Sequence, residues 1–365
     1  MNNEHMMITK NEENIYERST RNVMNKGRDA FISYDVATDC IDPDTGEPLI
    51  RSGDDVWERY FSYINNDADY DAENSLEANI IYRRVYGDII DRIDRKEIRP
   101  QLSSPNNSNR YYLKYEVGEP HCTGGLSFRG CVMNTAAITN KAYYWERKNK
   151  YKGITGIEFP WPREALEFMD LCNTPGNFLI LPYMRDLDIG KERGYHNRKQ
   201  TVSSSYRKDY FDIFLAAIYN FFLEQAGRER YNDIQLGHVI GSSDNLLLFM
   251  TYYLLPYIRD DESRFDEEGR QLIDDIEDGS RMICHVVPGW ESFVEKNMLQ
   301  DFVKSGFYDH FTEPYELWTG HFEMGQKTAA CPIGEDCFHE YWTKASDMIR
   351  KRSARIYDRL HKQRA

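Results

Sequence analysis

The sequence predicts a predominantly helical α+β fold, with a few short strands around one main core. Hydrophobic residues make up 41% and aromatic residues 14% of the 365-residue chain, which excludes an intrinsically disordered protein. Apolar residues recur at helical spacing in several segments, most clearly at 206–226 and 335–360. Extended patterns such as 178–182 are short and bounded by glycine and proline, and no internal repeat is visible.

The chain shows no compositional break that forces a division into domains. Residues 1–28 are polar and mixed in charge, and we interpret them as a mobile N-terminal arm. Residues 29–365 are expected to form one globular α+β domain, with a soft boundary near 100–110 as the alternative. Within it, the turn-rich sequence of 31–50 predicts a β-hairpin or a long loop.

The first half of this domain contains a predicted helix and a predicted strand. Asn74, with Glu77 three residues later, forms a capping-box-like start for a helix whose apolar positions continue to Ile93. The segment 111–117 is expected to be a strand, and the glycine-rich segment 118–130 a connection.

Three predicted helices and one strand follow. The segment 163–172 is a short amphipathic helix that ends at the Thr-Pro-Gly-Asn turn of 174–177. The apolar run 178–182 is then a buried strand. The segment 206–226 is the clearest helical pattern in the chain, and 290–304 is a further amphipathic helix.

The last predicted helix, 335–360, has an apolar stripe and a basic end. Its stripe consists of Phe338, Trp342, Ala345, Ile349, Ile356 and Leu360. Four cations, Lys351, Arg355, Arg359 and Lys362, share another face, and only through this face is contact with nucleic acid expected. A solvated helix face is the alternative, because the aromatic residues that nucleic-acid-binding modules interleave with such charge are absent beyond Tyr357.

The chain carries a strong excess of acid. It has 46 basic and 60 acidic residues, for a formal net charge of −14. Such a balance repels phosphate backbones and argues against a general nucleic-acid coat, but it does not exclude a local basic groove. The 26 tyrosines suit half-buried core positions or the walls of interfaces.

Nothing in the sequence indicates secretion or membrane insertion. The seven cysteines are odd in number and irregularly spaced, so no disulfide framework is predicted. The segment 1–19 lacks the basic and apolar regions of a signal peptide. The most apolar stretch lies in a predicted helix at 245–259, which is shorter than the roughly 20 residues of a membrane span and contains Pro256. We expect a soluble, cytoplasmic protein without a membrane partner.

No metal site is predicted, and the sequence leaves any cofactor unknown. Cys331, Cys337 and His339 lie close in sequence, but structural zinc prefers cysteines two to four residues apart and no second cysteine pair is present. We interpret this segment as a loop entering the last helix, and metal binding there stays open. The glycine-rich stretch 121–130 matches neither a dinucleotide-binding motif nor a P-loop.

Several short motifs occur in order along the chain. They are Thr-Pro-Gly-Asn-Phe at 174–178, His-Asn-Arg at 196–198, Asp-Tyr-Phe-Asp at 209–212, a histidine motif at His321, and Ile-Arg-Lys-Arg at 349–352. With them, residues 65–360 resemble a family of uncharacterised bacterial proteins. Cys131 and Val132 stand where that family has Asp-Thr. The resemblance implies a shared architecture and brings no established activity.

The candidate site consists of polar residues at or near the ends of apolar elements. They are Asn134, Asn177, Asn197, Arg198, Asp209, Asp212, His321 and Arg352. If the fold gathers them, their donors, acceptors, imidazole and guanidinium suit a phosphate, a nucleotide or another polar small molecule. The alternative is a buried network that fixes helix ends, with Asn177 and Asp209 as caps and Arg352 paired with Asp212.

Two functions follow from these residues. In the first, a bacterial or phage effector acts on a nucleotide or nucleic acid, with His321 and Asp209 as the candidate catalytic residues. His321 would supply the acid or base, Asp209 and Asn177 would orient the ligand, and Arg198 and Arg352 would clamp an anion. In the second, a non-enzymatic regulatory protein in phage–host conflict acts through an acidic, tyrosine-rich protein interface. The sequence does not decide whether the protein is an enzyme, nor its oligomeric state.

Overall fold

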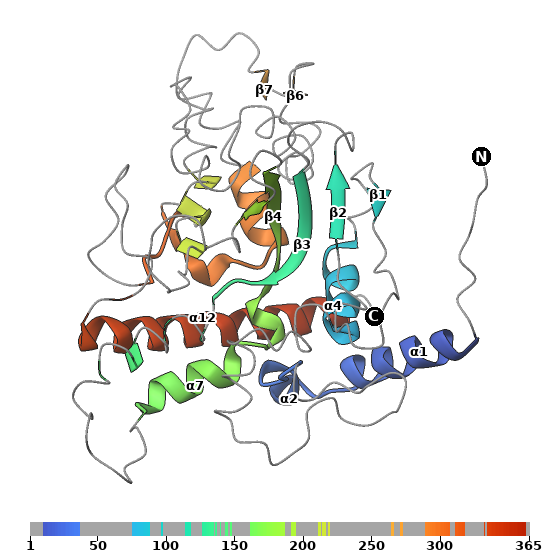
Figure 1. The fold of residues 1–365 in the computed structure, drawn as a ribbon, viewed down its shortest axis with the longest axis horizontal. Helices are drawn as coiled ribbons and strands as arrows, with labels where there is room; N and C mark the ends of the chain where they lie inside the picture. The colour runs from blue at the N-terminus through green and yellow to red at the C-terminus, as the bar shows by residue number, and fades with distance from the viewer. Residues whose placement is uncertain are drawn as a thin grey trace.

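The described residues form a mainly helical α+β fold, which confirms the predicted class at this level (Figure 1). The computed structural model describes residues 10–36, 75–87, 96–97, 114–117, 126–134, 161–186, 191–194, 264–265, 271–272, 289–306, 311–317 and 334–362, with single positions between 136 and 147, between 211 and 219, and at 332. Predictions elsewhere, including the helix at 245–259 and most of the hairpin or loop at 31–50, lie outside the described residues.

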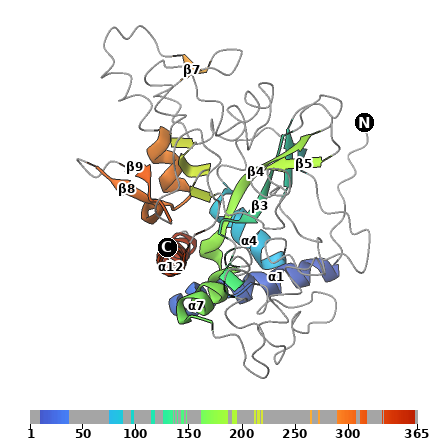
Figure 2. The same ribbon diagram turned by 60° about the vertical axis from the view of Figure 1, so that its left-hand side comes forward.

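Helix α12 (Glu335–Lys362) is the element on which much of the fold is assembled. It crosses the molecule at one end of the sheet, and α7 (Arg163–Leu171) and α2 (Arg28–Ile32) pack along it (Figures 1 and 2). All six residues of its predicted apolar stripe are buried. Periodicity alone therefore placed this helix correctly, because residues three or four apart share a helix face.

The main sheet has five antiparallel strands in chain order. They are β1 (Lys96–Glu97), β2 (Lys114–Val117), β3 (Leu126–Val132), β4 (Phe178–Asp186) and β5 (Lys191–Gly194). Two separate hairpins pair β6 (Arg264–Phe265) with β7 (Gln271–Leu272) and β8 (Val303–Ser305) with β9 (Phe311–Pro314). The predicted strand at 178–182 is confirmed within β4, and residues 114–117 of the predicted strand at 111–117 are confirmed as β2. Residues 111–113 lie outside the described residues.

The first five residues of strand β3 lie in the segment 118–130, which the sequence had assigned to a glycine-rich connection. Gly130 pairs with Ile180 of β4, and Tyr82 packs directly on it: a Cβ at Gly130 would lie 2.2 Å from Cε2 of Tyr82. The Tyr82 ring also contacts Phe178, with ring centroids 5.9 Å apart. The glycine therefore marks a close approach of a helix to the sheet rather than a loop.

Helix α4 (Leu76–Val85) carries Tyr82 and starts one residue later than predicted. Its N-cap is Ser75, whose Oγ accepts a hydrogen bond from the backbone N–H of Ala78 over 3.1 Å. The predicted start of the helix with Asn74 as its N-cap was wrong, because Ser75 occupies the N-cap position. Serine and asparagine are comparable N-caps, so local preference did not separate the two positions.

Two other segments differ from the sequence-based expectation. Helix α1 (Lys10–Met24) forms within the residues interpreted as a mobile arm, and its last turn buries Val23 and Met24. The segment predicted as one helix at 290–304 is helical at 289–296, then forms η5 (Gln300–Phe302) and enters β8. The division of the chain into arm and domain stays a prediction.

Most of the buried apolar side chains of the described residues form one cluster that extends from Val23 to Leu360. Aromatic rings contribute many of its contacts; Tyr143, for example, meets the ring edge of Trp342 at a centroid distance of 5.0 Å. Among these described stretches, no helix has the length and apolarity needed to span a membrane.

Candidate functional site

Asn177 connects three segments where η2 (Pro175–Asn177) enters β4. Its side-chain oxygen accepts a hydrogen bond from the backbone N–H of Asn134 over 2.9 Å. Its amide nitrogen donates to the carbonyl oxygens of Asn134 at 2.6 Å and Cys172 at 2.7 Å. Both asparagines are fully buried. Asn177 thus fixes the end of α7 and the end of β3 at the start of β4.

Arg352 projects from α12 toward the same place, where η2 enters β4; we call this meeting point of η2, β4 and α12 the joint. Its Nε donates to the carbonyl oxygen of Asn297 at 2.9 Å, and its Nη1 donates to those of Gly176 at 2.8 Å and Phe178 at 2.6 Å. Its Nη2 donates to the hydroxyl of Tyr86 at 2.7 Å. These four bonds occupy four of the five N–H groups of a guanidinium. The side chain is fully buried, so Arg352 ties α12 to segments far away in sequence.

Tyr86 follows α4 and receives one of these hydrogen bonds. Burial raises the pKa of its hydroxyl, and the nearby positive charge of Arg352 opposes this rise. Since desolvation is the larger effect, Tyr86 is a neutral phenol at physiological pH and stabilises the guanidinium as a hydrogen-bond acceptor.

The backbone of η2 also lies directly on α12. The N–H of Gly176 donates to Oγ of Ser353 over 2.8 Å. A Cβ at Gly176 would lie 2.0 Å from the carbonyl oxygen of Ile349 and 2.4 Å from Oγ of Ser353. Only a residue without a side chain permits this approach, which explains the glycine of the Thr-Pro-Gly-Asn turn.

The structure thus brings Asn134, Asn177 and Arg352 together, and Asp212 makes a different contact. One carboxylate oxygen of Asp212 accepts a hydrogen bond from the backbone N–H of Leu317 over 3.0 Å. The other four predicted site residues lie outside the described residues: Asn197, Arg198, Asp209 and His321. Their predicted roles stay predictions.

The gathered residues have the properties of an internal network rather than of a ligand-binding wall. Asn134, Asn177 and Arg352 are each 0% exposed, and Arg352 directs its donors at protein oxygens. A guanidinium whose three nitrogens already donate four hydrogen bonds has one N–H group left, which is too few for a bidentate contact with an anion. The alternative that the sequence left open, a buried network that fixes element ends, describes these three residues. Its predicted pairing of Arg352 with Asp212 was wrong, because the donors of Arg352 meet three backbone carbonyl oxygens and the hydroxyl of Tyr86.

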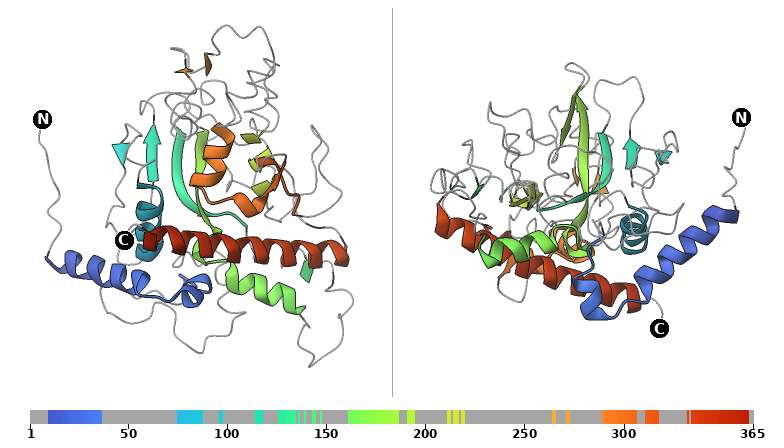
Figure 3. Two further views of the ribbon diagram at one scale, coloured as in Figure 1. Left: turned by 180° about the vertical axis from the view of Figure 1, so that it is seen from behind. Right: turned by 60° about the horizontal axis from the view of Figure 1, so that its bottom comes forward.

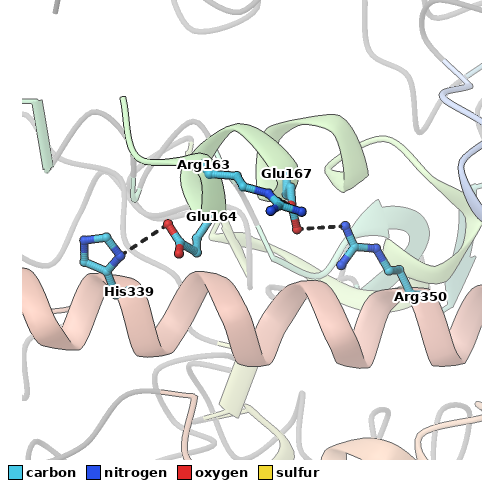
Figure 4. Close-up of polar contacts among 5 residues, drawn as sticks. All are labelled: Arg163, Glu164, Glu167, His339 and Arg350. Carbon is cyan, nitrogen blue, oxygen red and sulfur yellow. Dashed lines mark hydrogen bonds and ion pairs between the residues drawn. The ribbon is translucent and has the colours of Figure 1, made fainter. Parts of the chain in front are cut away.

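The segment considered for zinc begins α12, and His339 faces α7 there (Figure 4). Nδ1 of His339 lies 3.4 Å from a carboxylate oxygen of Glu164. Within the described part of the chain, no group of three histidine, cysteine, aspartate or glutamate side chains is placed to hold a metal ion. Cys337 is half-buried, and Cys331 lies outside the described residues.

A second polar contact joins the same two helices (Figure 4). The carboxylate of Glu167 on α7 accepts hydrogen bonds from Arg163 at 2.6 Å and from Arg350 on α12 at 3.2 Å. These two hydrogen bonds hold the pKa of Glu167 below its ordinary value of 4.5.

Glu167→Gln is expected to lower the stability of the protein at neutral pH, where the carboxylate is ionised in both the folded and the unfolded chain. The pKa of Glu167 is lower in the folded state than in the unfolded state. The stabilisation is therefore fully present above the pKa of the unfolded state and is lost as the pH falls through the pKa of the folded state. Urea unfolding of both proteins from about pH 7 to about pH 3 tests this. Glu295→Gln, at an exposed position, is the control. A wild-type advantage over Glu167→Gln that is constant with pH would contradict the prediction.

The predicted basic face of α12 is largely engaged with the protein itself. Arg355 pairs with Asp301 at 2.6 Å, and Lys351 pairs with Asp347 at 2.6 Å. Arg359 donates to the carbonyl oxygen of Lys296 over 2.7 Å. Three of the four cations therefore have intramolecular partners, which favours the solvated-face alternative over nucleic-acid contact at this helix.

A groove on the C-terminal half of α1 was missed by the sequence analysis. It is open to solvent and is lined by Arg18, Arg21, Asn22, Asn25 and Lys26. Arg18, Arg21 and Asn22 share a helix face because Arg18 lies three and four residues before the other two, and Asn25 and Lys26 follow directly after the end of α1. The signal was present in the sequence: residues 18–28 contain four basic residues and no acidic residue in a chain of net charge −14.

The cations of this groove differ in what they contact. Nε of Arg21 donates to the carbonyl oxygen of Glu17 at 3.4 Å, and Lys26 lies over the ring of Tyr34 at 4.0 Å from its centroid. The described part of the chain provides no hydrogen-bond or ion-pair partner for the exposed side chain of Arg18. The groove therefore presents charge that is not neutralised by neighbouring carboxylates among these residues.

Comparisons with known proteins add no functional information: no protein family, no curated protein and no solved structure matches the chain. The resemblance to an uncharacterised bacterial family stays a prediction from the quoted motifs.

Proposed function

We propose that this protein binds the phosphate backbone of a nucleic acid through the groove on α1. The observation that carries the proposal is the lining of this groove, which combines two arginines, one lysine and two asparagines. Arginine and lysine supply the charge that phosphate requires, and asparagine side chains add neutral hydrogen-bond donors. The buried network around Arg352 then serves as the framework that supports the described elements.

The net charge of the groove supports an anionic ligand. The C-terminus of a helix carries the equivalent of about half a negative charge, which opposes anion binding. Three cationic side chains line the groove, so they outweigh this effect by several-fold. A local cationic surface on an acidic protein also orients an approaching polyanion, since the rest of the molecule repels it.

The shape of the groove favours an extended polymer over a mononucleotide. Small-molecule sites are concave and cover most of the surface of their ligand, whereas this groove is open. It has no aromatic lining residue on which a base would stack. Contacts to phosphate without contacts to bases give binding that is independent of sequence and weakened by salt.

The proposal is tested by fluorescence anisotropy with labelled single- and double-stranded oligonucleotides of mixed sequence. Arg18→Gln with Arg21→Gln removes two phosphate contacts, so the slope of log K against log salt concentration should become shallower by about 2. Arg163→Gln with Lys304→Gln removes the same charge from α7 and β8 and should leave the slope unchanged. Equal slopes and affinities for the two double variants would refute the proposal, as would an absence of binding at low salt.

That the protein also catalyses a reaction on the bound nucleic acid is a separate proposal. It assigns His321 as acid or base and Asp209 as its orienting partner, both outside the described residues. The alternative of a regulatory protein interface in phage–host conflict also stays a prediction. Among the described residues, the exposed large hydrophobic side chains are Leu166 in α7 and Tyr315 directly after β9, and they give this alternative no specific support.

A further inference from the structure

The C-terminal end of α12 lies against the end of α1 that carries the groove (Figure 3). Nε2 of His361, in the last turn of α12, lies 3.2 Å from the carbonyl oxygen of Met24, the last residue of α1. The side chain of Arg28, which begins α2, pairs with Asp358 of α12 at 3.4 Å. Lys26, a lining residue of the groove, therefore lies in the chain between two residues that contact the end of α12.

Lys362 is the last residue of α12 and belongs to the same side of that helix. It follows Asp358 by four positions, so the two side chains share a helix face. Its side chain is exposed, and the described stretches provide it with no hydrogen bond or ion pair. The other three cations of the predicted basic face have intramolecular partners, so Lys362 differs from them in presenting its charge to solvent at the end next to α1.

The two segments that meet here carry a local excess of positive charge. Residues 17–29 and 358–362 contain three acids, Glu17, Asp29 and Asp358. Against these stand six cations, namely Arg18, Arg21, Lys26, Arg28, Arg359 and Lys362. The C-termini of α1 and α12 together add the equivalent of about one negative charge. The balance stays positive, in contrast to the net charge of −14 for the whole chain.

A nucleic acid that lies in the groove does not end at the boundary of the groove. Duplex DNA carries one phosphate charge for about every 1.7 Å of its axis, so phosphates continue on both sides of any short contact. The neighbouring surface at the end of α12 then faces phosphate as well. A cation there that is not already paired adds to the affinity, and an acid there subtracts from it.

We propose that the phosphate backbone bound in the groove on α1 continues across the end of α12, where Lys362 makes a further phosphate contact. Asp358 lies within this surface and weakens binding in two ways. Its carboxylate repels phosphate, and it holds the guanidinium of Arg28, which would otherwise face the ligand. This inference rests on the proposed function and adds a second helix to its binding surface.

The test is fluorescence anisotropy of the full-length protein with a labelled DNA duplex, from about 0.1 to about 0.3 M salt, where charges are screened within roughly 10 Å. Lys362→Gln removes one phosphate contact, so the slope of log K against log salt concentration should become shallower by about 0.9. Asp358→Asn removes the repulsion and releases Arg28, so binding should become tighter and the slope steeper by about 0.9.

Lys351→Gln and Asp347→Asn are the matched controls, because they make the same two changes of charge on the same helix. Lys351 and Asp347 pair with each other at 2.6 Å, and each lies eleven residues before its counterpart at 362 or 358. Eleven residues of helix span about 16 Å, which exceeds the screening distance at these salt concentrations. Both controls should keep the wild-type slope and affinity.

The outcomes separate this inference from the proposed function. If Arg18→Gln with Arg21→Gln makes the slope shallower while Lys362→Gln behaves as Lys351→Gln does, the groove binds nucleic acid and the contact at α12 is refuted. The role of Asp358 fails in the same way if Asp358→Asn binds no more tightly than Asp347→Asn. An absence of binding by the wild-type protein would overturn both the proposed function and this inference. Urea denaturation of each variant establishes that it is folded.

Discussion

Gly176→Ala is expected to destabilise the protein by about 3 kcal/mol or more, at the upper end of the range for overpacking. The new Cβ would lie 2.0 Å from the carbonyl oxygen of Ile349 and 2.7 Å from the backbone nitrogen of Ser353. Both are backbone atoms of α12, which cannot move aside as a flexible side chain could. The helix and η2 must separate, and the hydrogen bond from Gly176 N–H to Ser353 is then lost as well. Urea denaturation gives the free energy of unfolding directly.

Gly87→Ala is the matched control for this substitution. A Cβ at Gly87 meets no atom within 4 Å, so alanine there should be neutral or slightly stabilising. If both alanine variants had similar stability, the close contact between η2 and α12 would not be present in solution.

Arg352→Met is expected to cost about 3–5 kcal/mol, the range for the loss of one partner from a buried charged network. Methionine fills much of the space but donates no hydrogen bond, so three carbonyl oxygens and the hydroxyl of Tyr86 lose their donor. Each buried acceptor without a partner costs about 1–3 kcal/mol, and partial relaxation keeps the sum below four full penalties. A loss of this size is a large fraction of the about 5–15 kcal/mol by which folded domains are stable.

Arg350→Met tests whether this cost arises from burial. Arg350 lies two residues earlier on the same helix, and its partially exposed side chain pairs with Glu167. Surface ion pairs contribute about 0–1 kcal/mol, so this variant should remain close to the wild-type stability. Thermal or urea unfolding that shows equal losses for the two variants would contradict the assigned role of Arg352.

The two large effects should not add, because both substitutions act on one joint. Arg352 donates a hydrogen bond to the carbonyl oxygen of Gly176. Ser353, the next residue of α12, accepts a hydrogen bond from the N–H of Gly176. Alanine at Gly176 displaces the same carbonyl that methionine at position 352 leaves without a donor. The double variant should therefore lose less stability than the sum of the single losses.

Local patterns in the sequence were sufficient to locate several elements. The apolar stripe of α12, the amphipathic helix α7 and the strand that begins β4 depend on residues two to four positions apart, which a single sequence displays. The same patterns were less accurate at element ends. Ser75 and Asn74 are equivalent as caps by type, and the helix at 289–296 ends before the apolar pattern does.

The polar residues could not be interpreted from the sequence alone. Arg352 follows Ile349 by three positions and precedes Ile356 by four, so it occupies a core position within the apolar stripe of α12. That spacing indicates burial, but the sequence does not show which acceptors it meets. Those acceptors belong to residues 86, 176, 178 and 297, and only the packing of α12 against η2 brings them together.

The sequence by itself determined that the segments of α7 and α12 are helical and which face of each is apolar, because these properties follow from neighbours along the chain. The tertiary structure decided what the polar residues do. It directed Asn177 and Arg352 inward to join separate elements, and it left the cations of α1 facing solvent. A polar side chain is compatible with either environment, and its surroundings are set by contacts between residues far apart in sequence.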